Sequence, residues 1–290
     1  MPSREEKRVA YVMAAKRNTE DFERMARSLD PGQWDDDAND PDASSYPAAD
    51  HGPDPVPDWL ITSGDARQFD LGLLKTGKEA DVHLVERRHG DDVNVLAAKR
   101  YRKFEERQFR NDARYRAARR TGESRLDRAI ARGNKAGMAF RAQLWLATEF
   151  DVLCRLSSAG VPVPYPVQKL GNELMLELIG TTEQAAPRVV HAGLDKATLG
   201  EAWSQLVDAM HAMTRCGVVH GDLSPYNILW DTDRVVIIDF PQSVDPIAHP
   251  EGTALLERDV SNVTDWFIRR GVHCDPDELF ASLLSEVYHS

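Results

Sequence analysis

Cysteine is scarce in this sequence, and the few cysteines lie far apart. The 290 residues include three, Cys154, Cys216 and Cys274, and no two of them have the spacing of zinc ligands or of a redox motif. This pattern excludes a disulfide framework and a zinc finger. It predicts reduced thiols, as in a cytoplasmic protein.

Long apolar runs are also missing. No stretch approaches the roughly 18 consecutive apolar residues that a membrane span requires. The first residues are mostly charged, and no apolar stretch follows them, which is unlike a secretory signal. We therefore expect a cytoplasmic protein that makes no membrane contact.

Positive charge is in deficit overall, with 36 Lys and Arg against 47 Asp and Glu, and a net charge of −11 argues against general nucleic-acid binding. Residues 30–58 hold nine aspartates and no Lys or Arg. Such a composition cannot bury enough apolar surface to offset chain entropy. We predict that residues 1–58 form a charged extension that is disordered from residue 30. Its acidic part is either a solvated tether or an arm that competes for a basic surface.

Basic residues gather in one stretch, residues 99–135, which has fourteen Lys or Arg against five Asp or Glu. Few aromatic residues interrupt it: Tyr101, Phe104, Phe109 and Tyr115. The stretch could bind RNA phosphates or an acidic protein segment, or it could be a mobile solvated loop and helix face. Charge alone does not separate these alternatives.

The apolar pattern predicts strands first and helices later. We expect strands at 82–85, 93–99, 174–179, 228–230 and 235–238, with a turn at 87–92. Helices are expected at 136–158, where Gly160 ends the helix, at 197–216, and after the capping pair Asp275 and Pro276. Residues 161–166 contain three prolines and should be extended.

The strongest chemical signal is the segment H-G-D-L-S-P-Y-N at residues 220–227. Phosphoryl transfer needs a carboxylate that orients the attacking hydroxyl and accepts its proton, and an oxygen ligand for a magnesium ion. Asp222 suits the first role and Asn227 the second. Asp239 follows Asn227 by 12 residues, at the end of an apolar strand. Any one of these could be a solvated loop residue, but the three at this spacing favour a magnesium-dependent site.

Lys99 gives a second signal, because it ends the apolar strand 93–99. In kinases such a lysine holds the α and β phosphates and pairs with a glutamate of the next helix. Helical phase favours Glu149 as that partner, and Glu123 and Glu173 are rivals. The segment T-G-K-E-A-D-V at 76–82 has one glycine, so by itself it indicates only a turn.

Together these motifs resemble the RIO family of atypical serine/threonine protein kinases. Residues 76–82 are similar to the nucleotide loop that replaces the glycine-rich loop in that family, and residues 220–227 to its catalytic loop. I-D-F-P-Q at 238–242, H-P at 249–250 and R-D-V-S-N-V at 258–263 resemble its later segments. The resemblance covers about residues 70–270.

The resemblance implies an α+β, two-lobed kinase-like fold, with a β-rich N-lobe at 59–180 and a mainly helical C-lobe at 181–290. It implies Asp222 as the catalytic aspartate, and Asn227 and Asp239 as ligands of Mg²⁺ or Mn²⁺. Asp239 could itself accept phosphate, which would make it a second catalytic residue. ATP would contact the lysine, its glutamate, the loop and the hinge strand through Lys99, Glu149, Lys78, Glu79, Ala80, Val82 and the backbone of Glu177 and Ile179.

The sequence also departs from the family pattern. Leu74 and Lys75 stand where serine is usual before Thr76, and Pro225 stands where an acidic residue is common. No winged-helix pattern occurs in residues 1–58, which favours the bacterial-type subgroup without that domain. Residues 99–135 correspond to the family's variable loop, in which Thr121 and Ser124 are the hydroxyls available for autophosphorylation.

Three functions remain open at this point. The first is transfer of the γ-phosphoryl of Mg-ATP to protein serine or threonine, including the chain's own. The second is an ATPase-driven assembly factor that binds RNA or a ribosomal particle through residues 99–135. The third is a small-molecule kinase of the aminoglycoside or choline type, against which the 76–82 loop and Phe240-Pro241-Gln242 speak.

Overall fold

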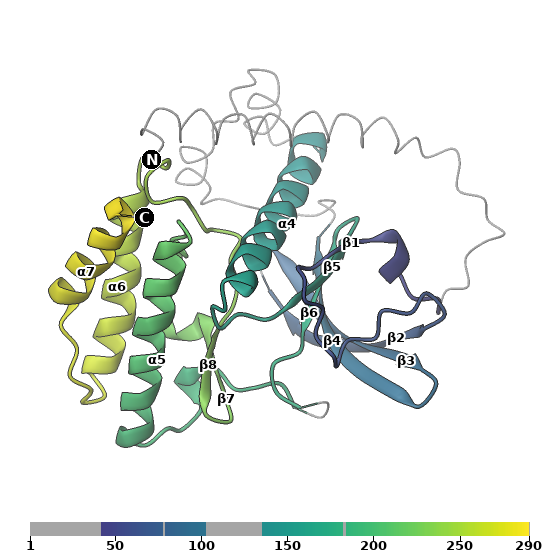
Figure 1. Ribbon diagram of the computed structural model, residues 1–290, viewed down its shortest axis with the longest axis horizontal. Coiled ribbons are helices and arrows are strands. Elements are labelled where there is room, and N and C mark those ends of the chain that lie inside the picture. Colours follow the sequence, from purple (N-terminus) through teal and green to yellow (C-terminus); the bar gives the residue numbers. More distant parts are fainter. Residues whose placement is uncertain (1–41, 78, 103–134, 182–183, 290) are drawn as a thin grey trace.

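A computed structural model describes residues 42–77, 79–102, 135–181 and 184–289. Figure 1 shows an N-terminal region built on a sheet, a C-terminal region built on helices, and one long helix, α4, between them. This is the α+β arrangement that the sequence predicts. None of the helices in the described ranges combines the length and hydropathy that a membrane crossing needs.

The N-terminal sheet has six antiparallel strands in the order β1-β5-β6-β4-β3-β2. Their bounds are β1 Asp50–His51, β2 Arg67–Thr76, β3 Ala80–His89, β4 Asp92–Tyr101, β5 Pro166–Leu170 and β6 Glu173–Glu177. Side chains alternate between the two faces of a strand. Leu96 and Ala98 of β4 are buried in a cluster on the outer face, so Lys99 lies on the opposite face, toward α4.

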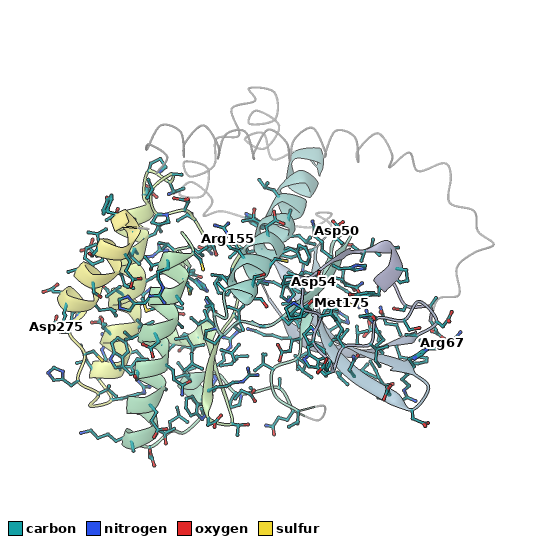
Figure 2. All side chains as sticks on the ribbon, in the orientation of Figure 1. Asp50, Asp54, Arg67, Arg155, Met175 and Asp275 are labelled. Carbon is teal, nitrogen blue, oxygen red and sulfur yellow. The ribbon has the colours of Figure 1, made fainter. Side chains whose placement is uncertain are left out.

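The long helices are α4 (Lys135–Ser158), α5 (Lys196–Arg215), α6 (Gly252–Ile268) and α7 (Pro276–His289). They match the predicted helices 136–158 and 197–216 and the helical C-terminus. Gly160 has φ +73° after the end of α4, a conformation that glycine adopts without strain. Asp275, labelled in Figure 2, accepts the Glu278 N–H at 2.9 Å and so caps α7 as predicted.

A hairpin and three short 3-10 helices are the remaining elements in the part of the chain that the structure describes. The hairpin pairs β7 (Ile228–Asp231) with β8 (Arg234–Ile237). It therefore brings the end of the 220–227 loop close to the start of the 238–242 segment. The 3-10 helices are η1 Tyr46–Ala48, η2 Val189–His191 and η3 Pro225–Asn227. The last lies inside the predicted catalytic loop.

One buried cluster joins α4 to the C-terminal helices. Leu153 and Leu156 of α4 share it with Leu206 of α5, Val263 of α6 and Leu283 of α7. The three cysteines are free thiols packed against this cluster, as predicted. Because α4 also packs on β4 and β5, this helix is fixed by both regions, and its buried face holds Glu149 between them.

Residues 42–58, predicted to be disordered, form an ordered layer on the sheet instead. β1 pairs with the edge of β5, with Asp50 opposite Lys169, and Figure 2 labels Asp50 and Asp54 on this segment. Tyr46 is buried in the outer cluster with Leu60 and Met175. Composition did not predict this order, because it depends on two contacts with the sheet: the burial of the Tyr46 ring and the pairing of β1 with the edge of β5. Residues 30–41 lie outside the described residues.

The predicted turn at 87–92 is shorter than expected, because β3 runs to His89 and β4 begins at Asp92. Arg87 is fully buried, and its guanidinium donates to the Ile61 carbonyl at 2.9 Å and to the side-chain oxygens of Gln168 and Gln68 at 2.7 and 3.2 Å. Burial lowers the pKa of Arg87 to about 10. An arginine predicted to lie in a turn therefore anchors the segment before β2 to the sheet.

We expect Arg87→Ala to lower the free energy of unfolding by about 3 kcal/mol, because buried oxygens of Gln168 and Ile61 lose their donor. Arg88→Ala is the matched control, since Arg88 lies on the exposed side of the same strand. Urea unfolding of both variants checks this. Equal midpoints for the two variants would show that Arg87 does not anchor the segment.

Candidate active site

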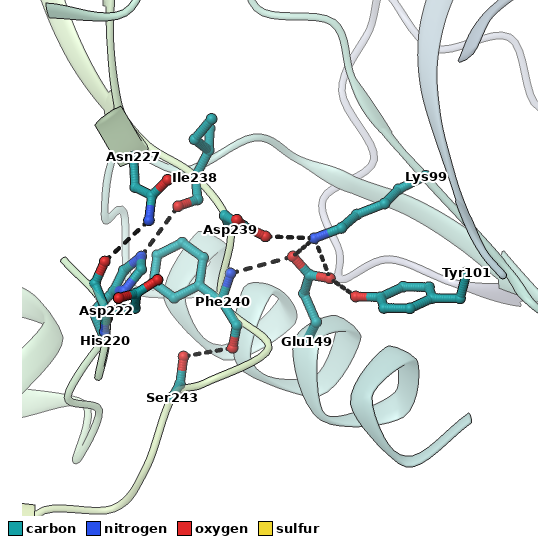
Figure 3. Close-up of polar contacts among 10 residues, drawn as sticks. All are labelled: Lys99, Tyr101, Glu149, His220, Asp222, Asn227, Ile238, Asp239, Phe240 and Ser243. Carbon is teal, nitrogen blue, oxygen red and sulfur yellow. Dashed lines mark hydrogen bonds and ion pairs between the residues drawn. The ribbon is translucent and has the colours of Figure 1, made fainter. Parts of the chain in front are cut away.

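The side chains predicted to hold phosphate and metal meet between the two regions (Figure 3). The Lys99 ammonium donates to Glu149 at 2.8 and 2.9 Å and to Asp239 at 2.7 Å. Burial alone would lower the pKa of Lys99, but the charges around it, led by that of Glu149, hold this pKa well above its ordinary value. Lys99 is therefore a fixed cation at the centre of the site.

Glu149 is the glutamate that pairs with Lys99, as helical phase favoured. Its rival Glu173 pairs with Arg100 at 2.6 Å, and Glu123 lies outside the described residues. The Glu149 side chain is 1% exposed and also accepts the Phe240 N–H at 3.2 Å and the Tyr101 hydroxyl. A buried carboxylate needs such partners, because an unpaired one would be strongly destabilising.

Asp239 lies just after β8 with φ +75°, a left-handed conformation that costs a residue other than glycine on the order of 1 kcal/mol. Its carboxylate is 47% exposed. Burial would raise the pKa of Asp239, but Lys99 beside it brings this pKa below its ordinary value. The strained backbone thus presents an ionised carboxylate to the space beside Lys99.

Hydrogen bonds to the backbone fix the predicted catalytic loop. The His220 Nε2–H donates to the Ile238 carbonyl at 3.1 Å, and its Nδ1 accepts the Asp222 N–H at 3.3 Å, an assignment that follows from these partners. Burial lowers the pKa of His220 to about 4, so the ring is neutral. The Asn227 amide donates to the Asp222 carbonyl at 3.0 Å. The loop therefore closes on itself, and Asp222 stays exposed.

The environment of Asp222 suits a proton acceptor. Partial removal from water raises the pKa of this carboxyl, and Asp239 adds to the effect while Arg258 opposes it. A raised pKa makes a carboxylate a stronger base at neutral pH. Asp222, Asn227 and Asp239 come from neighbouring parts of the loop and hairpin, as the spacing of the motif predicted.

A second group supports the loop from below, and its role was missed in the sequence. Both oxygens of Asp259 accept backbone N–H groups, from Leu223 at 2.8 Å and from Gly221 at 2.7 Å. The Arg258 guanidinium donates to the Gly221 carbonyl, and the Asn262 amide donates to the Leu223 carbonyl at 3.1 Å. Burial raises the pKa of Asp259 to about 7.

One sequence signal could have revealed Asp259. It falls on the buried stripe of α6 with Leu256, Val260 and Val263, where an aspartate needs a specific partner. Gly221 fits closely above it: a Cβ there would lie 2.4 Å from the Gln242 carbonyl oxygen, and φ is +78°. Glycine is therefore required at the turn before Asp222.

The predicted nucleotide loop is the tight hairpin between β2 and β3. The Gly77 N–H donates to the Ala80 carbonyl at 2.9 Å, and a Cβ on Gly77 would lie 2.7 Å from that oxygen. Val82 is the cross-strand partner of Lys99 and so lies on the same face. Ala80 is buried, and the Glu79 carbonyl accepts the Arg102 N–H at 3.2 Å.

The remaining predicted residues are Lys78 and those of the basic stretch, residues 99–135. Lys78, Thr121, Ser124 and most of the basic stretch lie outside the described residues. Tyr101, counted among the aromatic residues of that stretch, is buried at 1% exposure and faces Glu149. It is therefore closed to a nucleic acid, and its place is in the site.

The predicted hinge strand, residues 174–179, contains most of β6 and the two residues after it. The Glu177 N–H donates to the Tyr165 carbonyl at 2.9 Å, and the Ile179 carbonyl accepts the Ala186 N–H at 2.8 Å. The Glu177 carboxylate pairs with Arg234 of β8 at 3.7 Å. The segment is thus held from both the sheet and the hairpin.

The residues present fit a magnesium ion. The Asn227 amide nitrogen is occupied by the Asp222 carbonyl, which leaves its oxygen for a metal, and Asp239 adds an exposed carboxylate. Among the described residues no three His, Cys, Asp or Glu side chains form a metal cage. This donor set matches Mg²⁺, which takes one or two carboxylates and relies on phosphate oxygens and water for the rest.

Known proteins similar to this chain are kinases. The RIO domain family matches residues 81–279. The RIO-type serine/threonine-protein kinase Rio1 of Haloferax volcanii is 34% identical over 221 residues, 76% of this chain and 70% of that protein. The kinase RIO1 of Chaetomium thermophilum is 34% identical over 211 residues, 69% of this chain but 40% of that protein. Human RIO1 is 31% identical over 214 residues, 73% of this chain but 35% of that protein.

A solved structure supports the fold. The complex of Rio2 kinase with ADP, Mg²⁺ and phosphoaspartate from Chaetomium thermophilum has a TM-score of 0.52 with this chain at 22% identity, over 73% of this chain and 60% of that one. The likeness shows a kinase-like fold. Because the family match covers more than half of the sequence and includes Lys99, the catalytic loop and Asp239, the chain belongs to the RIO-domain family of atypical serine/threonine protein kinases.

Proposed function

We propose that this chain transfers the γ-phosphoryl group of ATP to serine or threonine hydroxyls of proteins, its own included. The observation that carries the proposal is the convergence of Lys99, Glu149 and Asp239 beside a loop that presents Asp222 and Asn227. These are the positive charge, the metal ligands and the base that phosphoryl transfer requires.

Each residue would have one task. Lys99, oriented by Glu149, would hold the α and β phosphates, and Asn227 and Asp239 would hold Mg²⁺ or Mn²⁺. The ion, when bound, supplies positive charge that neutralises the phosphate oxygens. Asp222 would orient the attacking hydroxyl and accept its proton, which suits an exposed carboxylate of raised pKa.

The adenine would lie against the hinge and under the hairpin of β2 and β3. Because the Glu177 N–H and the Ile179 carbonyl are already paired, the Glu177 carbonyl and the Ile179 N–H would bind the base. Val82 would cover it, beside Lys99 in the register. Glu79 and Ala80 would approach the phosphates through their backbone, because Gly77 lies closer to the Ala80 carbonyl than a residue with a Cβ could. We propose that Lys78, which lies outside the described residues, binds the phosphates with them.

The boundaries of the lobes belong to the proposal too. A β-rich lobe ends near residue 180, and a helical lobe follows. The first lobe includes residues 42–58, because β1 belongs to its sheet. Residues 42–58 form a 3-10 helix and a short strand, so this described stretch is not itself a winged helix.

A second candidate function is an ATPase switch in which Asp239 takes the phosphoryl group itself. It is favoured by the exposed side chain of Asp239 beside Lys99, and by the related Rio2 structure, which is a phosphoaspartate complex. An Asp239 oxygen would attack the γ-phosphorus, ADP would leave, and water would later hydrolyse the acyl phosphate. Such a switch would serve an assembly factor that binds RNA or a ribosomal particle through residues 99–135.

Labelling with γ-³²P-ATP and magnesium separates the candidate functions. Protein kinase activity predicts acid-stable label on serine or threonine of this chain or of added protein. The switch predicts label on Asp239 that hydroxylamine removes. Label transferred to an aminoglycoside or to choline, with none on protein, would contradict both and indicate a small-molecule kinase.

The role of Asp222 as the base can be tested by removing its charge. Asp222→Asn should lower the rate of phosphoryl transfer to protein by roughly 100- to 10,000-fold, because proton acceptance is lost. Affinity for Mg-ADP, measured by calorimetry, should stay within about twofold, because Asp222 is assigned no part in nucleotide binding. Asp208→Asn, an exposed carboxylate on α5, is the control and should keep full activity. An active Asp222→Asn protein would remove the kinase proposal.

The buried ion pair between Lys99 and Glu149 can be tested by removing the lysine charge. Lys99→Met should abolish activity and also lower the free energy of unfolding by about 3 kcal/mol, because Glu149 is left charged and buried. Adding Glu149→Gln should restore much of the stability but none of the activity. Lys196→Met, at the exposed start of α5, is the control. Thermal unfolding and labelling check both parts, and a stable, active Lys99→Met protein would contradict them.

A further inference from the structure

Tyr101, the last residue of β4, makes a contact that neither the motifs nor the proposed reaction accounts for. Its ring is buried, and its hydroxyl donates to Glu149 Oε2. Figure 3 shows the tyrosine on the far side of Glu149 from Asp239, with the hydroxyl aimed at the carboxylate. A buried hydroxyl that meets a buried carboxylate is a strong, charge-assisted hydrogen bond.

The contact completes the hydrogen bonding of Glu149. Oε1 accepts Lys99 at 2.8 Å and the Phe240 N–H at 3.2 Å, while Oε2 accepts Lys99 at 2.9 Å and the Tyr101 hydroxyl. Each oxygen thus has two donors, which is what a carboxylate oxygen accepts. Without the hydroxyl, Oε2 would keep Lys99 alone, and the carboxylate could rotate away from the lysine.

Tyr101 is itself held firmly, so it can hold another group. Its N–H donates to the Asn172 carbonyl at 2.9 Å, and its carbonyl accepts the Asn172 side-chain amide at 2.8 Å. Burial raises the pKa of Tyr101 well above its ordinary value, so the hydroxyl keeps its proton and remains a donor. The ring is therefore a rigid arm from the sheet to helix α4.

We propose that Tyr101 is a positioning residue whose hydroxyl holds the Glu149 carboxylate in the orientation that places the Lys99 ammonium for phosphate binding. The proposal rests on the function proposed above, because it assigns Lys99 to the phosphates of ATP. Tyr101 touches neither nucleotide nor substrate in this scheme. It acts on them through Glu149.

The test is Tyr101→Phe, which removes the hydroxyl and keeps the buried ring. We expect the affinity for Mg-ADP to fall about tenfold, as the loss of one hydrogen bond to a charged group implies, and kcat/KM for ATP to fall with it through a higher KM. Tyr46→Phe is the control: it removes a hydroxyl from another buried ring, in the outer cluster on the other face of the sheet. It should leave both quantities unchanged.

A double variant separates positioning from a general structural effect. If the hydroxyl acts through the carboxylate, Tyr101→Phe should cause no further loss of Mg-ADP affinity in a Glu149→Gln protein. A full tenfold loss in that background, or an unchanged affinity of Tyr101→Phe alone, would overturn the proposal. A wild-type chain that binds Mg-ADP but transfers no phosphoryl group would contradict the proposed kinase function, and the affinity cycle would still test Tyr101.

Discussion

The buried contact between Lys99 and Glu149 is the interaction on which the rest of the structure depends. Both charges are removed from water, so each needs the other, and the helix that carries Glu149 must stay against the strand that carries Lys99. The same lysine reaches Asp239, and the backbone after Asp239 returns to Glu149. The sheet, helix α4 and the segment after the hairpin therefore share one network of charged and hydrogen-bonded groups. Removal of one group in this network leaves its partners in the other elements unpaired.

The catalytic loop is stabilised differently, because the polar side chains around it form hydrogen bonds with the backbone and not with one another. His220, Asp259 and Asn262 all bind main-chain groups, and none of them points into the reaction space. The hydrogen bonds with Asp259 and Asn262 of α6 make the loop rigid, while the Asp222 side chain remains exposed. These hydrogen bonds and the buried side chain of Leu223 keep the loop in one conformation, which the alignment of a base with its substrate demands.

Local pattern was enough to predict the main helices, most strands and the residues that meet in the site. Strand ends located Lys99 and Asp239, and helical phase favoured Glu149 over two rivals. The sequence did not reveal what depends on distant partners. Residues 42–58 were predicted from composition to be disordered, but Tyr46 packs against Leu60 and Met175. Arg87 was predicted to lie in a turn, but three oxygens from other parts of the chain surround its guanidinium. The bond from Tyr101 to Glu149 spans 48 positions, and no periodicity reports such a pairing.

The left-handed backbone at Asp239 has a consequence for evolution. A glycine there would relax the chain, because it adopts that conformation freely, while an aspartate endures it at a cost of about 1 kcal/mol. The most stable residue for this backbone conformation is thus glycine, which has no carboxylate. Drift toward greater robustness would tend to erase this side chain, and its persistence in a lineage would report continuing selection for chemistry.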